Sequence, residues 1–196
     1  MTAILAPGNG VFFMRVGTHA RETLDEIVAR KLREIERVGY TFWGYGGNTC
    51  HPLMIVQPFA KERAQQGKPV FICMEEMEST NYFGEPQAAA EYSTDGRTWH
   101  EVPKDISVRG SRYALRINGL KTADFTLPLE DTRVRVGTSS GRLGSHFVAG
   151  TIDKACLVVE PGAGPTEPGS HRRISLVAEV HEPYAMLLRN FRAPAE

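Results

Sequence analysis

The stretch Gly39-Tyr-Thr-Phe-Trp-Gly-Tyr-Gly-Gly-Asn-Thr-Cys-His-Pro52 holds four aromatic residues, three further glycines and a Cys-His pair. It lies between two predicted helices, ahead of a remainder rich in predicted strands. Glycine lets a backbone approach another group closely, and Trp and Tyr combine a flat apolar face with a polar edge. The combination is typical of a wall around a planar ligand. The alternative is a glycine-rich turn whose aromatics fold back into the core, and the sequence leaves both interpretations open.

The residues on either side of this stretch predict helices. From Arg21 to Val38 the apolar residues recur at helical spacing, and Gly39 is suited to the C-cap. The segment from Leu53 to Gln66 is a second candidate helix, broken or kinked at Pro58. Both helices therefore lie in the N-terminal third of the chain.

The rest of the chain predicts short strands separated by Gly, Pro, Asn and Asp. A first strand, Val11–Val16, precedes the helices. The others are Val70–Met74, Ala88–Ser93, Thr98–Val102, Tyr113–Ile117, Phe125–Leu129, Val134–Gly137, His146–Val159, Ile174–Val180 and Tyr184–Leu188. Early helices followed by many strands predict an α+β fold, with a strongly bent mixed sheet or a small β-barrel and flanking N-terminal helices. We expect one domain over residues 1–196, with a flexible Pro- and Gly-rich loop at residues 161–170.

Composition restricts the classes of function. The 196 residues include 23 Lys or Arg and 23 Asp or Glu, so the net charge is zero. This balance argues against a protein that depends on long-range attraction to nucleic acid or anionic lipid. The three cysteines form no Cys-x-x-Cys pair, which argues against a disulfide framework and a cysteine zinc site and favours a reducing cytoplasm. We expect neither a signal peptide nor a membrane span.

Residues 39–92 carry a recognisable order of elements. Trp43 precedes the second predicted helix; then come the apolar strand Val70-Phe-Ile-Cys-Met74, the turn Ser79-Thr-Asn-Tyr-Phe83-Gly84 and a strand that begins Ala88-Ala-Ala. This order resembles the YTH and EVE domains of the PUA-like superfamily. The resemblance implies a compact barrel flanked by helices that holds a nucleobase, often a modified one, in an aromatic pocket.

The resemblance and the chemistry of the residues together give a set of candidate ligand contacts. Trp43 stands where the family places one pocket wall, Trp99 is a candidate for another, and Tyr45 is a further aromatic contact. A base stacked on an aromatic face gains about 1–3 kcal/mol, and hydrogen bonds to its edge select which base is held. Asn48 and Asn81 are the candidates for that selection. A free nucleotide or a small planar metabolite accounts for the neutral net charge better than a long nucleic acid does.

A phosphate contact is expected further along the chain. Gly137-Thr-Ser-Ser-Gly-Arg-Leu-Gly144 is rich in glycine and hydroxyl groups, although it lacks the Lys-Ser/Thr ending of a P-loop. With Arg133 and Arg135 on the preceding predicted strand, Arg142 would contact phosphate; the alternative is a plain loop without a phosphate. The histidines do not occur at metal-ligand spacing, so we expect no metal and no cofactor.

The rival hypothesis is a cysteine-dependent hydrolase or amidohydrolase. Cys50 would be the nucleophile, placed before a possible helix whose N-terminus favours a thiolate. His146 would be the base and Asp153 would orient its ring, in the Cys-then-His order of papain-like enzymes. The ordinary alternative is a buried apolar cysteine and an unrelated histidine. The sequence therefore favours a binding module for a nucleobase, nucleotide or single-stranded nucleic acid and leaves enzymatic activity open.

Overall fold

The computed structural model describes residues 3–46, 50–77, 86–149 and 152–193. Its regular elements, in chain order, are β1 (Gly10–Val16), α1 (Leu24–Val38), β2 (Thr41–Gly44), a π-helical turn (Pro52–Val56), α2 (Gln57–Gln65), β3 (Val70–Glu76), β4 (Ala88–Ser93), β5 (His100–Glu101), β6 (Tyr113–Pro128), β7 (Thr132–Val134), α3 (Gly144–Phe147), β8 (Lys154–Val159) and β9 (His171–Arg192). Short 3-10 turns cover Leu129–Asp131 and Gly137–Ser139. The expected α+β class is confirmed.

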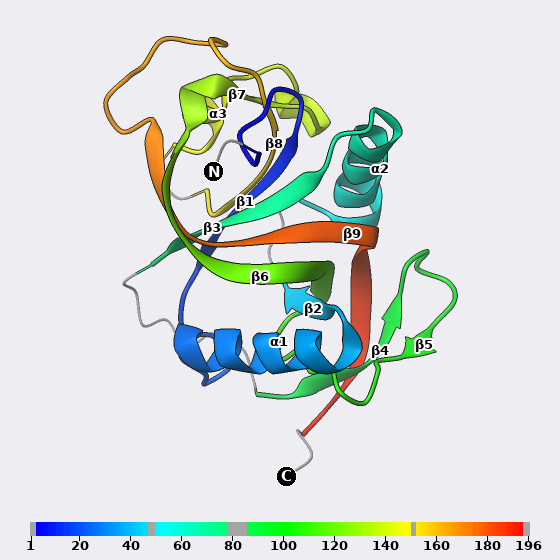
Figure 1. Ribbon diagram of the computed structural model, residues 1–196. Helices are drawn as coiled ribbons and strands as arrows, with labels where there is room; N and C mark the ends of the chain where they lie inside the picture. Colours follow the sequence, from blue (N-terminus) through cyan, green and yellow to red (C-terminus); the bar gives the residue numbers. More distant parts are fainter. Residues whose placement is uncertain (1–2, 47–49, 78–85, 150–151, 194–196) are drawn as a thin grey trace.

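The strands form one nine-stranded mixed sheet. Its main order is β2-β6-β9-β3-β1-β8-β7, and β4 pairs with both β9 and β5. Only β1 and β3 run parallel among the described pairings. The two longest strands, β6 and β9, pair along most of their lengths with three register shifts. Figure 1 shows β9 crossing the molecule and then turning sharply toward β4.

The sheet is strongly bent but does not close. Within the part of the chain that the structure describes, β2 and β7 stand at opposite ends of the strand order without pairing to each other. Of the two expected forms, the bent mixed sheet is therefore the one observed, and the small barrel is wrong. The shifts in the β6–β9 register bend the ribbon sharply, as bulges do.

Several expected element boundaries also differ. The predicted strand His146–Val159 begins as the short helix α3, and only Lys154–Val159 is a strand. The expected strand Thr98–Val102 is reduced to His100–Glu101. Tyr113–Ile117 and Phe125–Leu129 belong to the long strand β6, apart from Leu129, and Ile174–Val180 and Tyr184–Leu188 both lie in β9. Residues 161–170 contain neither helix nor strand, as expected of a loop.

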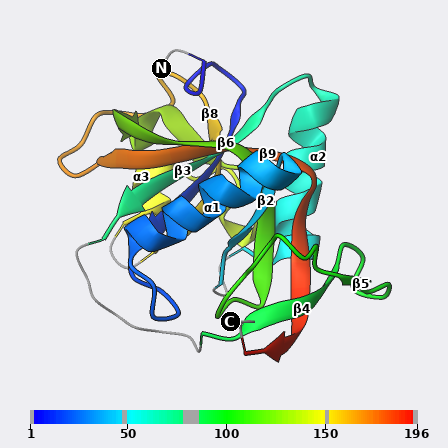
Figure 2. The ribbon, with the colours of Figure 1, turned by 60° about the horizontal axis from the view of Figure 1, so that its bottom comes forward.

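The core lies on both faces of β1. Side chains alternate along a strand, so Phe12 and Val16 pack in one buried cluster while Val11 and Phe13 pack in another. Helices α1 and α2 supply apolar residues to the first cluster, including Ile27 of α1. Figures 1 and 2 show α1 lying across the sheet near β2 and β6, with which it is in contact. In the described residues no helix is both long enough and apolar enough to cross a membrane.

Local capping fixes where α1 begins and ends. The Thr23 hydroxyl accepts a hydrogen bond from the Glu26 N–H at 3.3 Å, and the Glu26 carboxylate accepts one from the Thr23 N–H at 2.8 Å. This reciprocal arrangement is a capping box. At the other end Gly39 adopts φ 85°, and its N–H donates to the Ile35 carbonyl at 2.7 Å. The expected C-cap is therefore confirmed, and the start of α1 is held just beyond the end of β1.

We expect Thr23→Ala to lower the free energy of unfolding by about 1 kcal/mol, because the first turn of α1 loses its cap. Urea denaturation of the variant and the wild type measures the difference. Thr166→Ala, in the exposed loop 161–170, is the matched control and should leave the midpoint unchanged. Equal midpoints for Thr23→Ala and Thr166→Ala would contradict the capping assignment.

Candidate functional site

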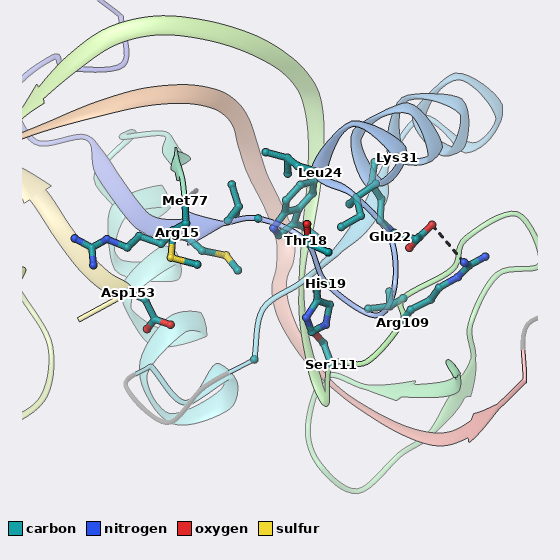
Figure 3. A pocket seen from close by; sticks show the side chains of 18 of the residues that line it. Arg15, Thr18, His19, Glu22, Leu24, Lys31, Met77, Arg109, Ser111 and Asp153 are labelled. Atoms are coloured by element: carbon teal, nitrogen blue, oxygen red, sulfur yellow. Dashed lines mark hydrogen bonds and ion pairs between the residues drawn. The ribbon is translucent and has the colours of Figure 1, made fainter. Parts of the chain in front are cut away.

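A cavity of about 560 Å³ opens where the end of β1 meets α1 and β2. The loop after β1, the segment Val108–Ser111 and the start of β8 complete its walls. Figure 3 shows Arg15, Met77 and Asp153 on one side and Glu22, His19, Ser111 and Arg109 on the other. The apolar lining residues are Met14, Val16, Leu24, Ile27, Trp43, Met77 and Val108. Its size lies in the usual range of small-molecule sites, about 300–1,000 Å³.

The helix and the neighbouring strand shape the cavity through residue size. On α1 the residues Leu24, Ile27 and Lys31 lie on one face, because they are three and four positions apart, and all three line the cavity. On β2 the wall contains Trp43 followed by Gly44. A side chain at Gly44 is excluded, because a Cβ there would stand 2.8 Å from the Ser111 hydroxyl oxygen.

A buried carboxylate network centred on Glu34 holds two of the lining residues, Arg30 and Lys31. Glu34 of α1, only 5 % exposed, accepts hydrogen bonds from Lys31 Nζ at 2.9 Å, Arg30 Nη1 at 3.1 Å and the Ser107 N–H at 3.1 Å. The Thr41 hydroxyl of β2 also donates to it. The network therefore joins α1, β2 and the segment that precedes β6.

Lys31 is the most unusual member of this network. Its side chain is 2 % exposed, and Nζ donates to Glu34 and to the Ser107 carbonyl at 2.7 Å. Burial lowers the pKa of Lys31 to about 8, although the charge of Glu34 opposes the shift. A cavity-lining amine with this pKa changes its charge close to neutral pH.

A second carboxylate, that of Glu22, connects the network to further charged residues of the cavity lining. Glu22 accepts two hydrogen bonds from Arg30, at 2.9 and 2.6 Å, and Arg109 Nη1 lies 3.3 Å from Glu22 Oε1. Burial raises the pKa of Glu22, but the hydrogen bonds and charges of the arginines outweigh it, and the pKa is lowered. Glu22 is therefore ionised and fixes both guanidinium groups. Nearby, the Ser111 hydroxyl lies 3.4 Å from His19 Nε2.

The opposite side of the cavity holds a further group of charges. Lys154, with a side chain only 8 % exposed, has its Nζ 3.5 Å from Asp153 Oδ2. Arg15 Nε lies 2.9 Å from Glu75 Oε2. The lining in total contains five Lys or Arg side chains and two Asp or Glu side chains. Outside the lining, Glu34 pairs with Arg30 and Lys31, and Glu75 pairs with Arg15, so these carboxylates of the described residues offset much of the positive charge.

Of the predicted aromatic contacts Trp43 and Tyr45, which the structure places in β2 and just after it, only Trp43 reaches the cavity. Trp43 lines it while also belonging to the core cluster, with 4 % of its surface exposed. Tyr45 is buried and is not among the lining residues; its hydroxyl donates to the Cys50 carbonyl, and burial raises its pKa. Tyr45 therefore holds the chain near Cys50, and of the two aromatics only Trp43 lines the cavity.

Trp99 lies elsewhere. It belongs to the segment that joins β4 to β5, and the Arg189 guanidinium of β9 stacks over its ring at 3.9 Å. Arg189 also pairs with Glu91 of β4 at 2.6 Å. Because β4 pairs with the far half of β9, the β4–β5 hairpin carries Trp99 away from the cavity. The structure does not bring Trp43 and Trp99 together.

The three arginines predicted to contact phosphate are also outside the cavity lining. Arg133 of β7 and Arg135 both contact Glu160, at 3.1 and 3.4 Å, and Arg142 donates to the His146 carbonyl at 3.2 Å. β7 stands at the opposite end of the strand order from β2. These arginines tie together the loops around β7. The other two candidate contacts, Asn48 and Asn81, lie outside the described residues.

The residues of the hydrolase hypothesis are not assembled. Cys50 is buried, and its sulfur accepts a hydrogen bond from the Cys156 thiol at 3.5 Å. His146 is half-exposed on α3, with Nε2 3.8 Å from Glu167 Oε2. Asp153 lines the cavity beside Lys154. The expected strand at His146 is instead the short helix α3. His146 on this helix pairs with Glu167 and not with Cys50 or Asp153. Among the described residues no cluster of three or more His, Cys, Asp or Glu side chains suits a metal ion.

Sequence reasoning missed the charged half of the cavity. Lys31 and Glu34 follow Leu24 and Ile27 at helical spacing, so two charged residues occupy the apolar face of α1. Charged residues are seldom buried unless they are paired. The two charged residues on the apolar face of α1 were therefore the sequence signal for a polar site. Arg109 and Lys154 gave no comparable signal, because only the fold brings them to the cavity.

In comparisons with known proteins, no family model, no curated protein and no solved structure matches the chain. The function is therefore argued from the cavity itself.

The pKa of Lys31 makes stability depend on pH in a defined direction. Between pH 8 and 10.5 the unfolded chain keeps the Lys31 proton that the folded protein has released, so the free energy of unfolding rises with pH across this window. Relative to Lys31→Met, the wild type should gain about 2–3 kcal/mol between these limits. Denaturant unfolding at stepped pH measures the gain, and Lys61→Met, on the exposed face of α2, is the matched control. A difference between wild type and Lys31→Met that does not change with pH would contradict the assignment.

Proposed function

We propose that this protein is a binding module that holds the base of a nucleotide, free or within a single-stranded nucleic acid, in the cavity beside Trp43. We also propose that the fold is PUA-like, as the order of elements in residues 39–92 suggests, with a bent sheet that does not close into a barrel. The observation that carries the proposal is that Trp43, selected from the sequence as a pocket wall, lines a cavity whose described lining also carries five Lys or Arg side chains.

The apolar part of the cavity has the chemistry that a base requires. A flat ring beside the accessible part of Trp43 would also contact the side chains of Leu24, Ile27 and Met77, which line the same space. Stacking on an aromatic ring contributes about 1–3 kcal/mol per base, and the methionine thioether adapts to planar groups. These contacts tolerate any base, so they give affinity without selectivity.

The polar part of the cavity supplies selectivity and charge complementarity. His19 and Ser111 both have hydrogen-bonding atoms at the lining and are 3.4 Å apart, so either can turn to the edge of a base. Arg109 lines the cavity with a side chain 25 % exposed, so a phosphate bound to it would remain partly in water. The buried Lys31 and Lys154 add positive potential deeper in the cavity. The ligand class that matches these features is a planar heterocycle carrying a phosphate.

The two tryptophans allow a direct test by fluorescence. The chain contains only Trp43 and Trp99, so Trp99→Phe leaves Trp43 as the sole emitter. We expect nucleoside monophosphates or short single-stranded oligonucleotides to quench this variant with a saturable curve, because the base approaches the indole. Trp43→Phe, which retains Trp99 and keeps an aromatic ring in the core, is the matched control and should show no saturable quenching. Quenching confined to Trp43→Phe, or none with any nucleotide, would contradict the proposal.

The phosphate contact has its own test. We expect Arg109→Gln to weaken nucleoside monophosphate binding roughly tenfold or more while changing nucleoside binding much less, because it removes a charged hydrogen bond to phosphate. Arg142→Gln, which alters an arginine outside the cavity, is the control. Isothermal titration with each ligand, alongside thermal melts of both variants, separates lost binding from lost fold. Equal losses for Arg109→Gln and Arg142→Gln, or a larger effect from Arg142→Gln, would move the phosphate contact to the β7 end of the sheet.

A further inference from the structure

Two cysteines far apart in the sequence lie side by side in the first core cluster. Cys156 lies in the middle of β8, and Cys50 lies between β2 and the π-helical turn. They are separated by 106 positions, and their sulfur atoms are 3.5 Å apart. Both are reduced, and both belong to the same core cluster. A disulfide requires a sulfur separation near 2.05 Å, so an approach of about 1.5 Å would join them.

The surroundings distinguish the two thiols. The Cys156 thiol donates its hydrogen bond to Cys50, and this lowers the pKa of Cys50, assisted by the positive charge of Lys154. Burial raises the pKa of Cys156. Cys50 retains 3 % exposure whereas Cys156 has none. Cys50 therefore has the greater thiolate character, and of the two residues it alone retains any exposed surface.

We propose that Cys50 and Cys156 form a redox-active dithiol, which hydrogen peroxide or a comparably small peroxide converts into an intramolecular disulfide. The Cys50 thiolate attacks one peroxide oxygen, the O–O bond breaks, and the departing hydroxide takes up a proton as water. Cys50 is then a sulfenic acid, oxidised by two electrons. The Cys156 sulfur attacks the Cys50 sulfur; the S–S bond forms, the S–O bond breaks, and the hydroxyl group leaves with the Cys156 proton as a second water.

The backbone around each residue is suited to this approach. Cys156 is held by pairing of β8 with β1, opposite Phe12. Cys50 lies outside the strands, so its side chain can approach Cys156 without breaking a strand pairing, while the Tyr45 hydroxyl restrains its carbonyl. Cys50 follows the lining residues Gly44 and Gly46 in the chain, and Cys156 is two positions after the lining residue Lys154. The new bond would therefore connect these two parts of the cavity lining. It would therefore clamp two walls of the cavity together and restrict the unfolded chain over a long loop.

The third cysteine provides a matched control. Cys73 of β3 is fully buried in the other core cluster, and burial raises its pKa to about 12. Its Cβ points to the opposite face of the sheet from the Cys50–Cys156 pair, consistent with its membership of that other cluster. Cys73→Ala should therefore leave the oxidation unchanged.

The experiment treats the reduced full chain with a small excess of hydrogen peroxide. We expect an intact mass lower by about 2 Da, a fall in thiols titrated after denaturation from three to one, and a peptide linking Cys50 to Cys156, all reversed by dithiothreitol. The oxidised protein should also melt several degrees higher, because the crosslink constrains the unfolded state. Cys73→Ala should form the same link, whereas Cys50→Ala and Cys156→Ala should form none.

Two results would overturn the proposal. One is peroxide treatment that leaves all three thiols of the wild type titratable under conditions that oxidise a free peptide thiol. The other is oxidation that joins Cys73 to either partner or adds oxygen to Cys50 without linking it to Cys156. Peptide mapping of the oxidised wild type gives this answer even if an alanine variant fails to fold.

Discussion

The position of α1 depends on the buried carboxylate of Glu34. A carboxylate removed from water is costly unless hydrogen bonds and opposite charges surround it, and removing one partner from such a group commonly costs about 3–5 kcal/mol. Here Arg30 and Lys31 approach from the same helix, Thr41 from β2 and the Ser107 N–H from the segment before β6. These contacts join three separate parts of the chain at one point. They attach α1, whose apolar face lines the cavity, to β2 and to the segment before β6.

The cavity and the cysteine pair share β8. Lys154 and Cys156 are two positions apart on this strand and therefore project to the same side of the sheet. Lys154 contributes a buried positive charge to the cavity lining and also favours the Cys50 thiolate. A change at either place thus alters the electrostatic surroundings of the other. Trp43 is in a comparable position, because the indole contributes both to the core and to the cavity wall.

The elements that follow from local patterns could be predicted from the sequence. The apolar spacing and Gly39 located α1 to within a few residues, and the apolar run at Val70 located β3. The features that could not be predicted depend on interactions between segments that are distant in the sequence. β6 and β9 were each predicted as two strands, because their partner continues the pairing across residues that locally signal a break. Trp99 and the arginines near β7 have suitable chemistry, but strand order carries them to other edges of the sheet, and no local pattern encodes that order.

The most direct test of the central claim is a crystal structure of the protein with a nucleoside monophosphate. We predict the base in the cavity against Trp43, with Leu24, Ile27 or Met77 on its other side and the phosphate near Arg109 or Lys154. A nucleotide bound instead at Trp99 or beside Arg133 and Arg135, with the cavity beside Trp43 empty, would contradict the account.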